Sequence, residues 1–495
     1  MLAFLSRYRS LPWLLASSCF FLVPIIETLW WLFLPGIVLL LVGLHLAKSR
    51  QEAFFGSLLT AAMKAAGASA WVWSTYPFVW LDLEPGFVQL LIIGAYWLVV
   101  SVFFGLGLAL AWCAYYELGT KFAGAFWLAP AFAGLWVIGE VLGSLSFSVF
   151  TLGPGSYINA YFSFGYLGYS VSHLAALYPL AVWGGVYLLT LAAALFGALV
   201  YFALVRANAR PRYFWTLFLL AAGVLVWRAF TPAQTYQPIG QTIIAIDTNF
   251  DTPFVRAEGG QKAKTLALLP AISLALVYEP DFILLPEDAR LTLNFGGSEA
   301  VLDYLSQFKK DVYLVDTSRF EDERGLIIER GFYYSLADGR VYETDKQYLT
   351  PQGEYIPHII AVLLRLFGHK EFLKEMESDQ NYHPGNLKGH QGFPEELPGI
   401  LFCSESVSPL SVRQIAKERG APFVLHPISH GRFHEPEILW RQLGEMLRVQ
   451  SIWNNKVIVE AANMARGRIF YPDGSTGGGR VLAGSAKWRL VEYGL

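Results

Sequence analysis

The first 231 residues contain a succession of apolar stretches that are long enough to cross a lipid bilayer, and this feature constrains the fold more than any other. A membrane-spanning helix needs about 20 mostly apolar residues. We therefore predict a multi-span α-helical membrane domain of about seven helices over residues 1–235. The predicted spans lie near residues 11–25, 28–47, 53–74, 87–113, 122–145, 173–205 and 213–231.

The overall composition agrees with a chain that is partly embedded in lipid. Hydrophobic residues make up 54% of the 495 residues and charged residues only 15%, whereas ordinary soluble domains carry about 25% charged residues. The net charge of −2 and the lack of a basic patch with interleaved aromatic residues argue against nucleic acid as a partner.

Positively charged residues occur in every second predicted loop, and this pattern predicts the orientation of the chain. They precede the first span and follow the second, fourth and sixth, at Arg7, Arg9, Lys48, Arg50, Lys121, Arg206, Arg210 and Arg212. By the positive-inside rule the N-terminus lies in the cytoplasm, so an odd number of spans places everything after about residue 231 on the other face. In a bacterium this predicts the inner membrane, with the second half of the chain in the periplasm.

Two segments of the first half need separate interpretation. The sequence Ala16-Ser17-Ser18-Cys19 follows a basic, apolar start and is similar to a lipoprotein signal, but apolar chain continues at once, and we predict a retained first span. Residues 146–172 are rich in Gly, Ser, Tyr and Phe, a composition that suits a loop dipping into the membrane interface.

From residue 236 onward, buried-strand patterns alternate with amphipathic helical patterns, which predicts a layered α/β domain. The predicted strands are 242–247, 282–285, 312–315, 400–403, 423–426 and 457–461, with a hairpin over 327–342. The predicted helices are 263–277, 299–308, 406–419 and 435–453. Residues 371–393 are polar and rich in Gly, and they predict either a mobile lid or a plain surface loop.

Three residues of this domain have an order and context that favour a thiol catalyst. Glu287 ends the pattern of one buried strand, Lys346 precedes a turn-rich stretch, and Cys403 closes another apolar strand. A carboxylate, an ammonium and a thiol at strand ends can share one pocket and perform acyl transfer through a thioester. In this interpretation Glu287 is the base, with a pKa raised by burial. Lys346 and the backbone N–H of Ser404 stabilise the oxyanion.

The remaining metal and thiol candidates are weaker. Cys19 and Cys113 lie in apolar spans, where small buried side chains are expected. His426, His430 and His434 recur every four residues, but Pro427 and Gly431 argue against one helix. We therefore predict no metal site and no cofactor, and we interpret these histidines as solvated or substrate-facing.

The residues around the three candidates resemble the nitrilase superfamily and, more closely, the apolipoprotein N-acyltransferases. In the second half the resemblance rests on Leu285-Pro286-Glu287, Asp345-Lys346, the stretch from Leu349 to Pro357, and Cys403-x-Glu405. In the first half it rests on Ala129-Pro130-Ala131, Leu135-Trp136, Glu140 and Phe164-Gly165-Tyr166. The resemblance implies a nitrilase-like αββα sandwich over residues 236–495, with Glu354 and Glu405 as supporting carboxylates.

The sequence departs from this family at four places. Ser404 stands where the family usually has Tyr, and Ser429-His430-Gly431-Arg432-Phe433 replaces an Asn-Asp-x-Trp-Phe-Gly pattern. The Arg expected shortly after Glu140 is missing, and the last residues, 487–495, are too few and too charged for a final membrane helix. Since the first two changes border the catalytic region, we expect normal thioester formation but a shifted choice of acceptor.

The resemblance implies a phospholipid-dependent N-acyltransferase that acylates the N-terminal amine of diacylglyceryl lipoproteins through a cysteine thioester. Two alternatives stay open at this stage. A membrane-tethered amidase would release the acyl group to water, and a non-catalytic homologue would only bind lipid or lipoprotein.

Overall fold

A computed structural model describes most of the chain. It covers residues 8–78, 84–122, 127–205, 238–251, 259–308, 310–387, 392–434 and 436–495, with a few isolated residues between positions 205 and 259. The seventh predicted span, 213–231, lies almost entirely outside the described residues.

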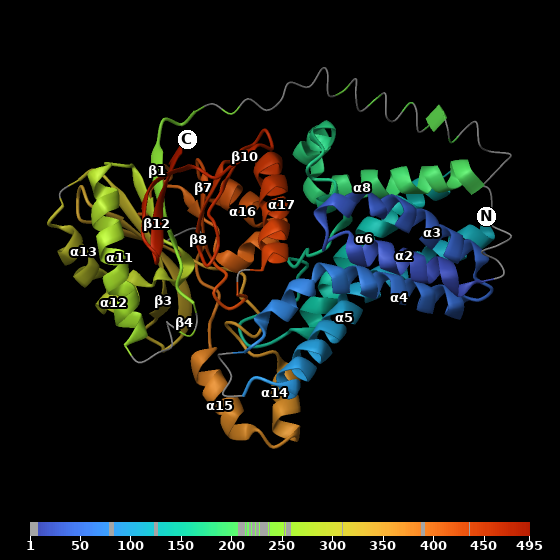
Figure 1. Cartoon of the computed structure of the whole chain (residues 1–495), viewed down its shortest axis with the longest axis horizontal. Helices are drawn as coiled ribbons and strands as arrows, with labels where there is room; N and C mark the ends of the chain where they lie inside the picture. Colours follow the sequence, from blue (N-terminus) through green and yellow to red (C-terminus); the bar gives the residue numbers. More distant parts are fainter. Residues whose placement is uncertain are drawn as a thin grey trace.

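The described residues of the first half form helices joined by turns and irregular segments (Figure 1). Its α-helices are α2 (Ser10–Leu22), α3 (Phe33–Leu46), α4 (Arg50–Ala68), α5 (Phe87–Lys121), α6 (Leu128–Phe150), α7 (Leu167–Ser170) and α8 (Tyr178–Val205). Three short 3₁₀ helices join them, η1 (Glu27–Leu32), η2 (Ala70–Thr75) and η3 (Ala175–Leu177).

Four described helical segments are long and apolar enough to cross a membrane, and each coincides with a predicted span. They are Glu27–Leu46, Phe87–Lys121, Leu128–Phe150 and Ala175–Val205. The first predicted span corresponds to α2, which is apolar but shorter than the four. The third corresponds to α4 followed by η2. Helix α4 is not among the four, and it contains three charged residues, Arg50, Glu52 and Lys64. The prediction of a multi-span helical domain is confirmed, while the number of seven spans stays a prediction.

Glycine allows α5 and α6 to approach each other closely. A Cβ atom at Gly107 would collide with the backbone at Gly139 and Gly143, and one at Gly143 would collide with the carbonyl oxygen of Phe104. Small residues at such crossings are a common feature of membrane helix packing. The segment after Glu140 that lacks the expected Arg, residues 141–144, therefore includes a point of backbone contact at Gly143.

The twelve described strands of the second half are hydrogen-bonded into one sheet that folds into two layers joined at one corner, and we refer to each layer as a sheet. The strands are β1 (Thr242–Thr248), β2 (Phe282–Leu284), β3 (Tyr313–Glu321), β4 (Ile327–Ser335), β5 (Val341–Asp345), β6 (Gly399–Ile400), β7 (Val424–Ser429), β8 (Ile458–Asn463), β9 (Ile469–Phe470), β10 (Thr476–Gly477), β11 (Arg480–Gly484) and β12 (Trp488–Gly494). One sheet has the order β11-β12-β1-β2-β3-β4-β5 and the other β6-β7-β8-β9-β10. A single residue pair, Thr248 with Asn463, connects β1 to β8.

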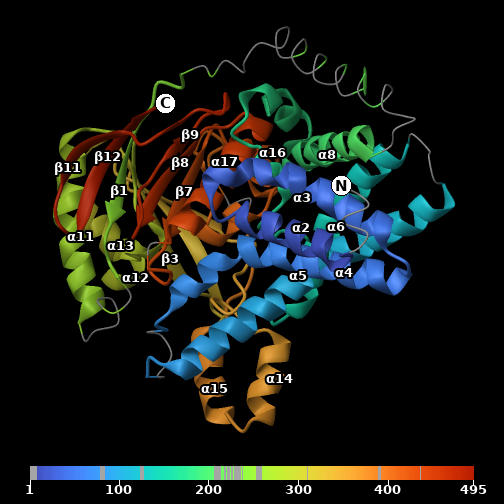
Figure 2. The ribbon, with the colours of Figure 1, turned by 45° about the vertical axis from the view of Figure 1, so that its right-hand side comes forward.

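The helices of this half are α11 (Gly260–Val277), α12 (Leu291–Phe295), α13 (Ser298–Leu305), α14 (His358–Leu366), α15 (Lys370–Asp379), α16 (Ser411–Glu418) and α17 (Glu437–Asn454), with short 3₁₀ helices η5 (Glu287–Ala289) and η6 (Cys403–Val407). Figure 2 shows this half from a second direction. Helix α11 lies on the outer side of the sheet that contains β1 and β12, and α16 and α17 lie on the side of the sheet that contains β7 and β8.

The two sheets pack face to face because their strands are apolar on both sides. In β1, Ile243 and Ala245 face the second sheet and pack with Leu425 and Val459, whereas Ile244 and Ile246 face the opposite way. Successive side chains of a strand point to opposite faces, so β1 contributes to two cores at once. These contacts confirm the predicted αββα order of layers.

The outer helices complete the sandwich through matched apolar faces. In α11, Leu268, Ala271, Ile272 and Ala275 follow the spacing of one helical face and pack on the first sheet. On the other side, α16 covers the second sheet and α17 lies between that sheet and the membrane helices (Figure 1).

Several predicted boundaries in this half are wrong in detail. The helix predicted over 406–419 begins at Ser411, because the residues after Cys403 form η6 instead. Residues 371–393 were predicted as a loop, but their first part belongs to α15. The last residues form β12, which pairs antiparallel with β1.

Helix α17 attaches the sandwich to the membrane helices. Arg441 donates hydrogen bonds to the carbonyl oxygens of Pro24 (2.7 Å) and Ile25 (2.8 Å), in the turn after α2. The Trp453 ring lies directly against Gly185, where α8 is kinked and the backbone has a φ of 55°. A side chain at Gly185 would collide with that ring, so glycine permits both the kink and the contact.

Candidate functional site

The three candidate catalytic residues each stand close to the end of a strand: Lys346 directly follows its strand, and two residues separate Glu287 and Cys403 from theirs. Glu287 is the first residue of η5 and follows β2, Lys346 follows β5, and Cys403 is the first residue of η6 and follows β6. Glu287 and Lys346 follow strands of one sheet, and Cys403 follows a strand of the other. The site therefore lies where corresponding ends of the two sheets meet.

The structure brings the predicted ammonium and carboxylates into direct contact. The Lys346 Nζ lies 2.6 Å from Glu354 Oε1 and 3.7 Å from Glu287 Oε1. Lys346 is only 1% exposed, and its two carboxylate partners are largely buried. Glu354 is itself fixed, because its other carboxylate oxygen accepts a hydrogen bond from the backbone N–H of Thr350 (2.7 Å). Lys346 is therefore held between two carboxylates on short, well-anchored segments.

Glu405 connects the nucleophile turn to the segment that carries Lys346. Its Oε1 accepts hydrogen bonds from the backbone N–H groups of Gln347 (2.7 Å) and Tyr348 (3.1 Å), and its Oε2 accepts one from Phe402 (3.2 Å). These contacts join the residues directly after Lys346 to the residue directly before Cys403. Glu405 thus contacts the segments that carry both residues, and its role as a supporting carboxylate stays a prediction.

Cys403 is partly buried and faces a mixed environment. Its Sγ lies 4.0 Å from the carbonyl oxygen of Ser429, at the end of β7. Its apolar side packs against the same core cluster that contains the membrane helices and Val407. The Ser404 hydroxyl donates a hydrogen bond to the carbonyl oxygen of Tyr348 (3.4 Å). The nucleophile therefore lies at the boundary between the sandwich and the helical half.

The electrostatic state of the site follows from burial and from these charges. Burial by itself lowers the pKa of Lys346, but the charges of Glu354 and Glu287 outweigh it and raise the pKa, so the side chain is an ammonium. Burial and the charge of Glu287 raise the pKa of Cys403 well above its usual value, although Lys346 acts in the opposite direction. Cys403 is therefore a thiol at neutral pH, and the predicted role as nucleophile requires a base that takes its proton.

Two further groups around Lys346 were missed by the sequence interpretation. Glu329 of β4 is 4% exposed, and burial raises its pKa to about 8. Arg330 binds Asp345, the residue before Lys346, with a distance of 2.7 Å between its Nε and the Asp345 Oδ1. The hairpin predicted over 327–342 places both residues on a strand, but no local pattern shows that this strand lies beside Lys346.

The three spaced histidines do not converge. The His426 Nδ1 lies 2.7 Å from the carbonyl oxygen of Leu401, and His434 Nε2 lies 3.4 Å from that of Pro77. His426 lies in β7, and both His426 and His430 are buried, so neither is a solvated loop residue; the substrate-facing alternative stays a prediction. Within the described residues, no group of three or more His, Cys, Asp or Glu side chains could hold a metal ion.

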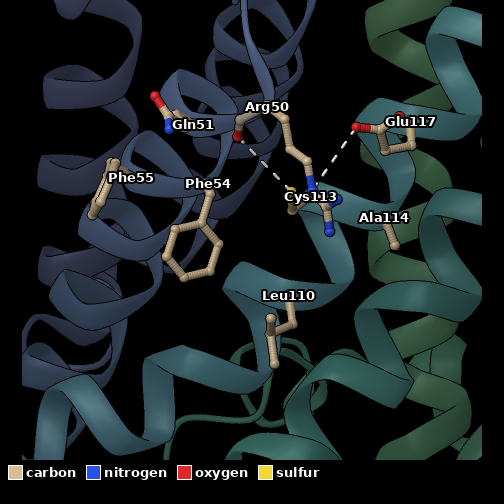
Figure 3. A pocket seen from close by; sticks show the side chains of 8 residues that line it. All are labelled: Arg50, Gln51, Phe54, Phe55, Leu110, Cys113, Ala114 and Glu117. Carbon is tan, nitrogen blue, oxygen red and sulfur yellow. Dashed lines mark hydrogen bonds and ion pairs between the residues drawn. The ribbon is translucent and has the colours of Figure 1, made fainter.

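A hollow of about 440 Å³ lies elsewhere, between the N-terminal end of α4 and the C-terminal end of α5 (Figure 3). It is lined by Arg50, Gln51, Phe54, Phe55, Leu110, Cys113, Ala114 and Glu117. None of the candidate catalytic residues lines it, so it is distinct from the site around Cys403.

Comparison with known proteins gives matches in structure only. No protein-family model matches the sequence, and no curated protein matches it. Among solved structures, an amidase from Nesterenkonia sp. is 14% identical, with a TM-score of 0.35, and the match covers 53% of this chain and 94% of that one. A carbon-nitrogen hydrolase from Helicobacter pylori G27 is 13% identical, with a TM-score of 0.35, over 51% of this chain and 89% of that one. A variant of the Nesterenkonia AN1 amidase from the nitrilase superfamily is 14% identical, with a TM-score of 0.35, over 53% of this chain and 93% of that one.

The arrangement has the parts that thiol-based acyl transfer requires. It combines a thiol with a raised pKa, a carboxylate near a fixed ammonium, and a second carboxylate that holds the ammonium in place. Such a set can form and resolve a covalent acyl-enzyme without a metal or an organic cofactor. The structure brings together Glu287, Lys346, Glu354, Cys403 and Glu405, and their individual roles stay predictions.

Proposed function

We propose that this protein is a phospholipid-dependent N-acyltransferase that acylates the N-terminal amine of lipoproteins through a thioester on Cys403. The observation that carries the proposal is the position of Cys403. Its polar surroundings contain the Glu287, Lys346 and Glu354 set, while its apolar side packs on the cluster formed with the membrane helices. A nucleophile at that boundary suits a substrate whose ester lies at the surface of a bilayer.

The first half-reaction transfers an acyl chain from the phospholipid to the enzyme. The Cys403 Sγ attacks the ester carbonyl while Glu287 takes the thiol proton. The Lys346 ammonium and the backbone N–H of Ser404 stabilise the negative oxygen of the tetrahedral intermediate. The intermediate collapses as the C–O bond breaks, Glu287 returns the proton to the departing alkoxide, and lysophospholipid leaves.

The second half-reaction transfers the acyl chain to an amine. The neutral α-amine of a diacylglyceryl lipoprotein attacks the thioester, and Glu287 takes a proton from the attacking nitrogen. The C–S bond then breaks, and the Cys403 thiolate regains a proton from Glu287. Each proton and electron pair is accounted for within the enzyme and its two substrates, so the cycle needs no cofactor.

The decisive experiment is a mass spectrum of the Cys403 peptide after incubation of the detergent-purified protein with phosphatidylethanolamine micelles. An added acyl mass on wild type, absent in Cys403→Ala, supports the acyl-enzyme. Release that depends on a diacylglyceryl-cysteine peptide supports the transferase. Equal release to water without that peptide favours the amidase, and an absence of acyl mass would leave only a binding role.

The proposal includes a location, the bacterial inner membrane with the sandwich in the periplasm. Charge alternation in the loops supports this orientation. A periplasm-dependent reporter fused after residue 231 should be active, and the same reporter fused at residue 210 should be inactive. The reverse result would contradict the orientation and exclude a periplasmic lipoprotein as acceptor.

A further inference from the structure

An ion pair is buried inside the helical half of the chain, on helices that carry none of the candidate catalytic residues. The Lys64 Nζ of α4 lies 2.9 Å from Glu140 Oε1 of α6, and the two side chains are only 9% and 2% exposed. Removing two charges from water costs several kcal/mol per ion in typical proteins, and such a pair adds little net stability. Ionisable residues inside membrane helices are therefore candidates for a functional role.

Glu140 uses both carboxylate oxygens to gather several elements around the pair. Its Oε1 also accepts hydrogen bonds from the Trp136 Nε1 (3.0 Å) and the backbone N–H of Leu167 (2.8 Å). Its Oε2 accepts one from the Thr190 hydroxyl of α8 (3.2 Å). Lys64 in turn donates a hydrogen bond to the carbonyl oxygen of Gly165. Both members of the pair therefore hold the chain between α6 and α8.

The held segment reaches the candidate site within a few residues. We call residues 161–168 the bracing segment. Ser163 donates two hydrogen bonds to the carbonyl oxygen of Val407, from its backbone N–H (3.2 Å) and from its hydroxyl (2.7 Å). Val407 is the last residue of η6, the turn that begins with Cys403. The bracing segment therefore supports η6, the turn that begins with Cys403.

The same segment also supports the residues that follow Lys346. The Tyr161 hydroxyl donates a hydrogen bond to the carbonyl oxygen of Leu349 (2.5 Å), and its ring stacks on that of Tyr348 with centroids 5.0 Å apart. Tyr348 is one of the residues whose backbone N–H binds Glu405. The bracing segment therefore contacts both strand-end segments on which the candidate catalytic groups stand.

We propose that Lys64 and Glu140 are positioning residues, which set the relative placement of Cys403 and Lys346 through the bracing segment. The inference rests on the proposed function, since it assigns the pair a part in thioester formation. Acyl transfer is sensitive to placement, and a shift of about 1 Å can lower a rate about 100-fold. A buried ion pair suits this purpose because its geometry is narrowly defined, whereas apolar packing alone permits sliding.

The test compares Lys64→Met with a matched control on the same helix. Arg50→Met removes the cation of a neighbouring pair, in which Arg50 Nε lies 3.9 Å from Glu117 Oε1 and the two side chains are 77% and 41% exposed (Figure 3). Each purified full-length variant is incubated with phosphatidylethanolamine micelles and, separately, with the soluble ester 4-nitrophenyl butyrate. The rate of acylation at the Cys403 peptide is measured for both.

We expect Lys64→Met to lower the acylation rate about 100-fold with both esters, mainly in kcat, because the chemical step is misaligned. Lys64→Arg should recover much of the rate, and Arg50→Met should match wild type. Equal rates in Lys64→Met and Arg50→Met would overturn the inference. So would a loss that follows only the fraction of folded protein, because the pair would then be purely structural.

A second readout separates this inference from the proposed function. Alkylation of Cys403 by iodoacetamide, read as the alkylated fraction of its own peptide, requires no acyl transfer. A displaced nucleophile turn should change the Cys403 rate in Lys64→Met but not in Arg50→Met. If wild type forms no acyl-enzyme, the proposed function fails, while this comparison still decides whether the pair positions Cys403.

Discussion

Replacing Lys346 by Met should affect stability and chemistry in two separable ways. Lys346 is 1% exposed and lies between Glu354 at 2.6 Å and Glu287 at 3.7 Å, whose side chains are 12% and 19% exposed. The methionine keeps the length of the side chain but leaves two largely buried carboxylates without their cation. The variant should therefore be destabilised as well as inactive.

The magnitude follows from these distances and from the cost of burial. At an effective dielectric constant of about 20, the attractions of Lys346 to Glu354 and Glu287 are roughly 6 and 4.5 kcal/mol. Desolvation of the ions offsets much of this, and removal of one partner from a buried pair typically costs about 3–5 kcal/mol in the free energy of unfolding. Loss of an oxyanion-stabilising group lowers the rate of the chemical step by about 100- to 1,000-fold.

The two effects are measured by denaturant unfolding in detergent and by acylation of the Cys403 peptide. The double variant Lys346→Met with Glu354→Gln should regain part of the lost stability, because one unpaired carboxylate is gone, and it should stay inactive. Lys310→Met is the control, since the Lys310–Glu279 pair is solvent-exposed and its loss should change neither readout. A single variant as stable as this control, or a double variant that acylates normally, would refute the reasoning.

Three other substitutions give equally direct predictions. Glu287→Gln should block acylation but speed alkylation of Cys403 at pH 7, because it removes a negative charge that raises the thiol pKa; slower alkylation would contradict this. Burial raises the pKa of Glu405 from 4.5 to about 7, so the folded chain holds this proton more tightly than the unfolded chain, and the associated stability is lost as pH rises through that interval. The unfolding midpoint of Glu405→Gln should consequently fall less than that of wild type between pH 5 and pH 8. Ser404→Tyr should increase acyl release to a diacylglyceryl-cysteine peptide relative to water, and an unchanged ratio would show that this position does not select the acceptor.

Local sequence patterns were sufficient to predict the elements and the three strand-end residues. Glu287 and Cys403 each stand shortly after a short apolar strand and Lys346 directly follows β5, and strand ends on one edge of a sandwich meet in space. The extent of the elements was harder to predict. The helix after Cys403 begins only at Ser411, because Glu405 binds the backbone of its own turn and favours a short 3₁₀ helix there.

The contacts between the two halves were not predictable from local pattern. Ser163 and Val407 are 244 positions apart, and nothing near either residue indicates that they bind each other. The same holds for Lys64, which reads as one charge in a moderately apolar helix until its partner on α6 is known. Periodicity reports which face of an element is buried, but it carries no information on which distant side chain meets that face.

The burial of Glu140 shows how a charge can find its partner on a distant part of the chain. The residues after Glu140 lack the expected Arg, and Gly143 lies where the backbones of α5 and α6 touch, so no side chain fits there. Glu140 nevertheless has a cation, because Lys64 reaches it from α4. The carboxylate needs a positive partner to be buried at this depth, and the fold supplies it from another helix. The charge requirement is therefore met in three dimensions even though the sequence around Glu140 does not contain it.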